Sequence, residues 1–337
     1  MSDKTLPLQI LEDAMNNRLP VENGFIQVPT AVFVAKIDVG MPLPPALELF
    51  KKDESGKIVQ LKSREQPYSP LVLSQWETVW IKIEDLKALQ KTAEDRILSP
   101  SLLDSTEAPE KKAELLRATA IHVTEDLFKD PSPANIERSQ RVVGSFVYAM
   151  MKDPKMYHFL SQLSSHDPYT LQHSVGTSVI CIILARKLGI TDSQDLSDVG
   201  QAGLLHDIGK IKINKDIINK NAPLDEFEWD EMRQHAEEGF KILEDNPQVS
   251  ERAKRAVLQH HENHQGTGYP KGLKGDQIDL FAKIVCICDI YNALTTDRTY
   301  SKAKTPFEAF NYMRSNLSHK IDDAIFRELV KIYGGQI

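Results

Sequence analysis

Histidine and aspartate, which can hold metal ions or transfer protons, are concentrated in one part of this 337-residue sequence. Eight of the ten histidines lie between residues 158 and 264, and several fall in apolar segments that are predicted to be helices. The candidate ligands are His173, His206, Asp207, His235, His260, His261 and Asp289. Burying so many polar groups without partners costs free energy, so the pattern favours a metal site. Imidazole and carboxylate without thiolate are ligands for Fe, Mn, Zn, Ni or Co.

The motif LLHDIGK strengthens the argument for a metal site. Its adjacent His206 and Asp207 follow two leucines and precede Gly209, which we interpret as the residue that ends a helix. A carboxylate at the apolar end of a helix implies a nearby cation, either the Lys210 side chain or a metal ion. Seven ligands exceed the needs of one tetrahedral ion, and a carboxylate can bridge two ions about 3.5 to 4 Å apart. The ligand set therefore favours two metal ions.

Each of these residues also has a purely structural interpretation. A single histidine such as His173, at the edge of an apolar stripe, is more often a core residue than a ligand. A helical domain with structural metal ions would fit the same residues. The cysteines Cys181, Cys286 and Cys288 lie in apolar helical stretches and are predicted to be small buried side chains rather than ligands.

Composition limits the class of protein. Apolar residues make up 41% and charged residues 26% of the chain, as in soluble globular proteins. No apolar run approaches the roughly 18 residues of a membrane span, and the N-terminus does not resemble a secretory signal. These features predict a cytoplasmic protein that does not bind membranes. The net charge of −7 gives no general attraction for nucleic acid.

The elements that must position the candidate ligands divide the chain into parts. Residues 1–98 carry short β-rich runs, followed by the amphipathic helix EDLKALQKTAEDRI, and predict a small mixed α/β domain with a regulatory or interaction role. Residues 99–152 are predicted to be a linker with connecting helices, and 153–337 an all-α domain. The β-rich runs are GFIQVP, ELFKKDESGKIVQLK and ETVWIKI. Helices are expected at 107–129, 134–151, 154–163, 169–188, 195–208, 225–244, 250–263, 279–296, 306–316 and 322–333.

Over roughly residues 150 to 320, the motifs resemble a known family. His173, His206–Asp207 and Asp289 are similar to the H…HD…D pattern of HD-domain metal-dependent phosphohydrolases. HDIGK, HHENHQGTGYP and GLKGDQI resemble, in order, the motifs of the HD-GYP subfamily, whose members hydrolyse the bacterial second messenger cyclic di-GMP. The resemblance implies an all-α HD-GYP domain at 153–337, often preceded by a small α/β or sensory domain.

The resemblance also implies a function for individual residues. His173, His206, Asp207 and Asp289 would hold one metal ion, and Asp207 would bridge to a second ion held by His235, His260 and His261. Lys210 would contact the substrate phosphate and help to protonate the leaving oxygen. Gly268 and Tyr269 would shape the pocket, and Arg298 would contact the substrate.

The chain departs from the family pattern at several positions. Tyr169 stands where some members have a glutamate that holds a third metal ion, so we expect two ions. Gln265 and Asn292 replace aspartates that are common in the family, and Ser301 replaces a common basic residue. Loss of that cation predicts weaker or altered substrate binding.

The expected function is hydrolysis of cyclic di-GMP to pGpG or GMP by a hydroxide that bridges two divalent transition metal ions. Fe is the expected metal, with Mn, Ni, Co or Zn as alternatives. The alternative functions are a slow or inactive module that acts as a cyclic dinucleotide receptor or binds a protein, and a phosphodiesterase for another cyclic dinucleotide. The partners considered are a diguanylate cyclase (GGDEF) protein and a second copy of the chain.

Overall fold

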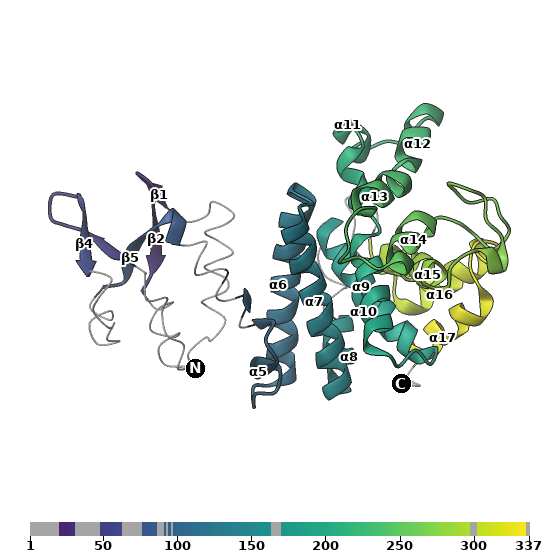
Figure 1. Ribbon diagram of the computed structural model, residues 1–337, viewed down its shortest axis with the longest axis horizontal. Coiled ribbons are helices and arrows are strands. Elements are labelled where there is room, and N and C mark those ends of the chain that lie inside the picture. Colours follow the sequence, from purple (N-terminus) through teal and green to yellow (C-terminus); the bar gives the residue numbers. More distant parts are fainter. Residues whose placement is uncertain are drawn as a thin grey trace. The chain divides into compact units, whose positions relative to one another are not determined.

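The structure is a computed structural model that describes residues 20–30, 48–62, 76–85, 91, 94–95, 97–162, 170–296 and 302–334. The chain divides into two compact units, residues 1–99 and 100–337. The first contains the strands and the second is helical (Figure 1). The predicted layout of a small strand-containing unit followed by an all-α unit is therefore confirmed.

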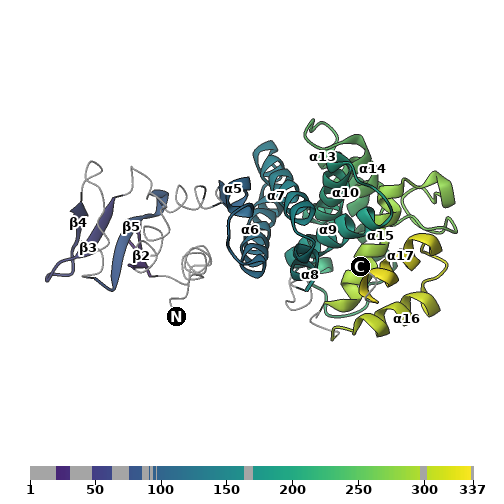
Figure 2. The ribbon, with the colours of Figure 1, turned by 90° about the horizontal axis from the view of Figure 1, so that it is seen from below.

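The first unit is built on an antiparallel sheet with strand order β1-β2-β5-β3-β4. Figure 2 labels four of these strands, β2, β5, β3 and β4. The strands are β1 (Val21–Glu22), β2 (Phe25–Pro29), β3 (Leu49–Lys52), β4 (Ile58–Lys62) and β5 (Thr78–Lys82). The β3–β4 turn forms because the Asp53 carboxylate accepts hydrogen bonds from the backbone N–H groups of Ser55 and Lys57. The short strand β1 was not predicted, and most of the predicted helix at 84–97 lies outside the described residues.

The second unit is a helical domain. Its elements are α5 (Pro100–Leu103), α6 (Pro109–Lys129), α7 (Pro133–Lys152), α8 (Lys155–Gln162), α9 (Thr170–Lys187), α10 (Ser193–Leu205), η2 (Ile208–Lys212), α11 (Lys215–Ile218), α12 (Glu226–Arg233), α13 (His235–Leu243), α14 (Glu251–Gln259), η3 (Gly275–Gln277), α15 (Leu280–Thr295), α16 (Pro306–Asn316) and α17 (Asp323–Tyr333). Helix α9 packs against α10 and α15, and α10 packs against α7 and α14. Helices α6 and α7 pack against each other and onto this group, at α9 and α10.

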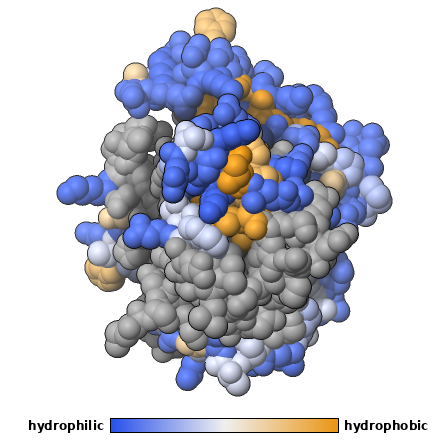
Figure 3. Space-filling view, turned by 90° about the vertical axis from the view of Figure 1, so that its left-hand side faces the viewer, coloured by the Kyte–Doolittle hydropathy of each residue, from blue (hydrophilic) through white to orange (hydrophobic). Residues whose placement is uncertain are grey.

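Apolar burial follows the predicted helical stripes. Helices α9 and α15 are apolar on nearly every side and are largely buried, as expected for helices at the centre of a bundle. The three cysteines are free and buried, as predicted. In the part of the chain that the structure describes, no helix combines the length and apolar character needed to cross a membrane. Hydrophilic side chains predominate on the described part of the face drawn in Figure 3, around a small apolar area.

Two predicted helices are divided in the structure. The segment predicted at 195–208 is α10, which ends at Leu205, followed by the separate turn η2. The segment predicted at 225–244 is α12 and α13, which meet at Gln234. The interpretation of Gly209 as the residue that ends a helix is therefore wrong, because α10 ends four residues earlier and Gly209 lies inside η2.

Candidate metal centre

The structure brings the seven candidate ligands together from five parts of the fold. His173 lies on α9, His206 at the end of α10, His235 at the start of α13, and Asp289 on α15. Asp207 joins α10 to η2, and His260 and His261 follow α14. Two groups could each hold a metal ion: His173, His206 and Asp207, and His235, His260 and His261. In each group, one ligand atom per residue lies within 4.8 Å of the others.

The first group includes Asp289 in its contacts. His173 Nε2 lies 2.9 Å from Asp289 Oδ1, and His206 Nε2 lies 3.8 Å from the same oxygen. His206 Nε2 is also 3.4 Å from Asp207 Oδ2. The two imidazole rings are 5.3 Å apart between centroids. Two imidazoles and two carboxylates thus face one small volume. These side chains come from α9, from the end of α10 and the residues that follow it, and from α15.

The second group lies on the other side of Asp207. His235 Nε2 is 3.2 Å from His260 Nε2, and the rings of His260 and His261 are 4.0 Å apart between centroids. Asp207 Oδ1 lies 3.7 Å from His235 Nε2, whereas its Oδ2 faces His206. The carboxylate of Asp207 therefore presents one oxygen to each group.

Backbone carbonyls orient three of the histidines. The Nδ1 atoms of His206, His235 and His260 lie 2.8, 2.6 and 2.6 Å from the carbonyl oxygens of Gly203, Met232 and Val257. A carbonyl oxygen can only accept a hydrogen bond, so each Nδ1 carries the ring proton and donates a hydrogen bond to the carbonyl. Each Nε2 then directs a lone pair into the centre, as metal-ligating histidines do.

These lone pairs lack a matching donor among the described residues. His206 Nε2 is buried and forms no hydrogen bond with any described residue, and the facing Nε2 atoms of His235 and His260 both act as acceptors. Acceptors that face each other in a buried space are costly unless a cation lies between them. The donor set and its orientation thus fit divalent metal ions.

The protonation states also suit metal binding. Burial lowers the pKa of His173, His235 and His260, and lowers the pKa of His261 to about 3, so these four rings are neutral at pH 7. Burial opposes ionisation of Asp207, but Lys210 and His206 outweigh it and hold the pKa of that carboxyl well below its usual value. Burial likewise opposes ionisation of Asp289, but the hydrogen bond with His173 favours the carboxylate, and the pKa of that carboxyl is lowered. Neutral imidazoles and ionised carboxylates are the ligand forms.

His206 differs from the other histidines. Burial alone would lower its pKa, but the carboxylates of Asp207 and Asp289 outweigh burial and raise the pKa. In the metal-free protein this ring is therefore the one that most readily takes up a proton. Such a proton would occupy the Nε2 position that a metal ion would otherwise take.

Lys210 lies at the rim of the centre. Its Nζ donates to Asp207 Oδ2 at 2.7 Å, and its side chain is 28% exposed. Lys210 thus contacts the carboxylate of Asp207 while part of its side chain remains exposed to solvent. It is the cation that the sequence placed beside Asp207, and the structure puts it in contact with that carboxylate.

Gly209 lets η2 pack directly onto α13. A Cβ atom at this position would lie 1.9 Å from the carbonyl oxygen of His235 and 2.4 Å from the nitrogen of Gly239, both of which are backbone atoms that cannot move aside easily. The close approach carries Asp207 and Lys210 toward His235. A glycine is needed here for space rather than for a helix end.

Replacing Gly209 with Ala is therefore expected to lower the free energy of unfolding by about 1–3 kcal/mol, as for an overpacked core. Chemical denaturation of the metal-free protein measures this change. Gly144→Ala in α7 is the matched control, because a Cβ there meets nothing within 4 Å; alanine should leave stability unchanged or raise it by up to about 1 kcal/mol. Equal effects of the two substitutions would contradict this explanation of Gly209.

Asn292 contacts the centre but was named from the sequence only as a departure from the family pattern. Its side chain is fully buried, and its Nδ2 lies 2.8 Å from the carbonyl oxygen of His173 and 3.2 Å from the ring Nδ1 of the same residue. Thr296 donates to Asn292 Oδ1 at 3.1 Å. Asn292 therefore holds His173 in place. Its position three residues after Asp289 on α15, on the same helical face, was the available signal.

The loop after His261 carries Tyr269. The Tyr269 ring lies 4.7 Å from the ring of His261 and 6.4 Å from that of His235, measured between centroids. Burial raises the pKa of its hydroxyl, so it stays protonated. Gly268 lies in the same loop, against the backbone of residues 261–263. His264 lies exposed in this loop and belongs to neither group.

Some predicted residues cannot be placed. Arg298, Ser301 and Tyr169 lie outside the described residues. Gln265 is described and exposed in the loop. The expected substrate contact of Arg298 and the expected effect of Ser301 stay predictions.

Comparison with known proteins identifies the family. The HD-domain family matches residues 122–325. A cyclic di-GMP phosphodiesterase of Pseudomonas aeruginosa is 35% identical over 227 residues, which cover 66% of this chain and 54% of that protein. A 3'3'-cGAMP-specific phosphodiesterase of Vibrio cholerae is 37% identical over 169 residues, which cover 50% of this chain and 36% of that protein. The chain thus spans about half or less of these two curated relatives.

A solved structure shares the fold. The HDG"Y"P protein of Bdellovibrio bacteriovorus superposes with a TM-score of 0.62 and 17% sequence identity, covering 92% of this chain and 100% of that one. The family match spans every element that contributes a candidate ligand, from α9 to α15. With HDIGK and GTGYP standing at the centre itself, the chain belongs to the HD-domain family, in its HD-GYP branch.

Proposed function

We propose that this protein is a metal-dependent phosphodiesterase that hydrolyses cyclic di-GMP. The observation that carries the proposal is the position of Asp207, which presents one carboxylate oxygen to each of two histidine groups. His173, His206, Asp207 and Asp289 would hold one divalent ion, and Asp207, His235, His260 and His261 a second. When bound, such ions lower the pKa of a coordinated water and take up charge on the phosphoryl oxygens.

The chain's own residues would complete the reaction. Water adds its oxygen to phosphorus, the bond from phosphorus to the leaving oxygen breaks, and that oxygen takes a proton. The ammonium of Lys210 would balance phosphate charge and supply this proton. Its side chain is partly exposed and its Nζ lies 2.7 Å from Asp207, which supports this role. Tyr269 and Gly268 would shape the wall of the pocket, and Arg298 would contact the substrate. The products would be pGpG or GMP.

The choice of metal and substrate is the finer part of the proposal. Nitrogen and oxygen ligands suit Fe and Mn, with Ni, Co and Zn as alternatives. Cyclic di-GMP is favoured because the Pseudomonas aeruginosa relative, which aligns over 227 residues, is named for it. The second candidate is 3'3'-cGAMP, since the Vibrio cholerae relative is named as specific for that molecule.

The test is turnover by the full chain, purified without oxygen and loaded with Fe or Mn to measured full occupancy. Cyclic di-GMP should be consumed at ordinary enzyme rates, roughly 1 s⁻¹ or faster, and faster than 3'3'-cGAMP in direct competition. Preference for 3'3'-cGAMP would establish the second candidate. Tight binding in calorimetry without turnover would instead support the alternative of a receptor module. For the first unit, a regulatory or interaction role stays a prediction.

A further inference from the structure

Glu262 is a buried carboxylate that does not face the metal centre. It follows the ligand pair His260–His261 directly, and the residue is only 2% exposed. Its Oε1 accepts a hydrogen bond from the backbone N–H of Lys271 at 2.7 Å, and its Oε2 accepts one from that of Leu273 at 2.9 Å. Both carboxylate oxygens are thus engaged by the far end of the loop that begins at Asn263.

The same loop folds back on its own beginning. The backbone N–H of Tyr269 donates to the carbonyl oxygen of His261 at 3.3 Å, and Asn263 Oδ1 accepts from the N–H of Thr267 at 3.0 Å. A Cβ at Gly268 would lie 2.4 Å from that carbonyl oxygen, so the backbone at Gly268 is in direct contact with the backbone at the start of the loop. The result is that the Tyr269 ring lies 32° from parallel to the ring of His261.

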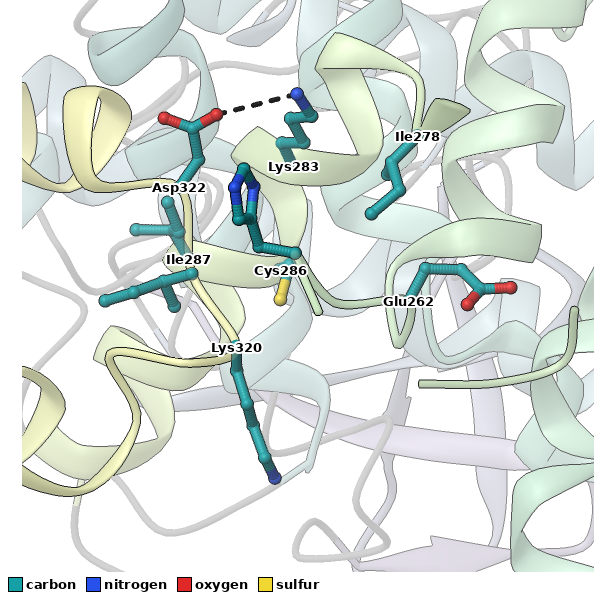
Figure 4. Close-up of a pocket in the computed structure, with 9 residues that line it drawn as sticks. Glu262, Ile278, Lys283, Cys286, Ile287, Lys320 and Asp322 are labelled. Atoms are coloured by element: carbon teal, nitrogen blue, oxygen red, sulfur yellow. Dashed lines mark ion pairs between the residues drawn. The ribbon is translucent and has the colours of Figure 1, made fainter. Parts of the chain in front are cut away.

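The loop has a small pocket on one side and exposed residues on the other. A small pocket lies between the loop, α15 and the segment that leads into α17, and its lining includes Glu262, His264 and Ile278. Figure 4 shows this pocket, with Glu262 and Ile278 labelled. Across it, Lys283 of α15 pairs with Asp322 at 3.5 Å. His264, Gln265 and Thr267 are exposed. The backbone N–H of His264 also donates to the carbonyl oxygen of Lys320 at 3.3 Å, so hydrogen bonds tie the loop at several points.

We infer that Glu262 is the positioning residue of the 263–273 loop: it ties Lys271 and Leu273 to the residue after His261, and so holds Tyr269 beside that histidine. Glu262 belongs to neither ligand group. Glu262 would affect the reaction only by positioning Tyr269, so this part of the inference rests on the proposed function. The effect of Glu262 on the conformation of the loop does not depend on that function.

The test compares Glu262→Ala and Glu262→Gln with the wild-type full chain by hydrogen exchange, metal content and kinetics. Hydrogen bonds to a charged acceptor are stronger than neutral ones, so exchange of the loop amides should quicken about ten- to a hundredfold in the Ala variant. Gln keeps one acceptor and should give a smaller increase. Metal content should match the wild type, and KM for cyclic di-GMP should rise about tenfold with a smaller change in kcat.

Glu308→Gln is the matched control, because Glu308 also accepts from a backbone N–H, that of Thr305 in the α16 cap. It should leave exchange of the loop unchanged. Unaltered loop exchange in folded Glu262→Ala, or exchange that quickens equally across α14 and α15, would overturn the inference. Should the Ala variant fail to fold, the near-isosteric Gln variant decides. If the wild type shows no turnover, the proposed function fails while the exchange comparison still tests Glu262.

Discussion

Asp207→Asn is expected to reduce kcat for cyclic di-GMP by at least about a thousandfold while leaving the protein folded. An amide carries no charge and cannot offer an anionic oxygen to each of the two histidine groups, as the carboxylate does. Metal ions that act on a phosphoryl group contribute several kcal/mol, and each 1.4 kcal/mol corresponds to a factor of ten in rate. Metal content measured on the same sample should also fall.

Asp198→Asn provides the matched control for Asp207→Asn. Asp198 is likewise a buried carboxylate, but it lies within α10, accepts a hydrogen bond from Gln194 of the same helix and belongs to neither ligand group. Its substitution should change neither metal content nor kcat by more than about twofold. Full metal occupancy and normal turnover in Asp207→Asn would show that this residue does not join the two groups.

Acidification is expected to destabilise the metal-free protein from about pH 6.5 downward. The pKa values of His173, His235, His260 and His261 are lowered by burial, so the unfolded chain binds protons there before the folded protein does. Their contribution to stability is present above about pH 6.5 and is lost as pH falls. Below about pH 6.5, each ring that stays neutral in the folded protein lowers the free energy of unfolding by about 1.4 kcal/mol per pH unit.

The raised pKa of His206 has the opposite effect on stability, because protonation of this ring stabilises the folded protein below pH 6.5. The lowered pKa values of Asp207 and Asp289 act only below about pH 4, where the unfolded carboxyls take up protons. Between pH 6.5 and 4, four lowered histidines therefore oppose one raised histidine, and stability falls.

Thermal unfolding in chelator at a series of pH values measures this loss. From pH 7.5 to 5.0 we expect Tm to fall by on the order of 10 °C. His261→Gln, which removes one of the rings that resist protonation, should make the slope shallower. A Tm that is constant over this range, or that rises, would contradict the lowered pKa values.

Much of the fold follows from local patterns. The apolar stripes and their breakers predict the positions of α6–α10 and α14–α17 to within a few residues, because helices in a bundle must bury one face. The strands at 25–29, 49–52, 58–62 and 78–82 follow from β-rich runs and a turn. What failed were local details, such as the break at Gln234 and the turn η2, where tertiary contacts decide.

By itself the sequence determined the ligand types, their places on apolar helices and their likeness to a family. Residue chemistry and spacing are local properties, and they need no coordinates. The family resemblance implied that the histidines form two groups with Asp207 between them, but the contacts within each group came only from the tertiary structure, since they depend on how α9, α10, α13, α14 and α15 pack. The same holds for Gly209, Asn292 and Glu262, whose partners lie on other elements or at the far end of a loop. Such contacts join distant positions of the chain, and no local pattern records them.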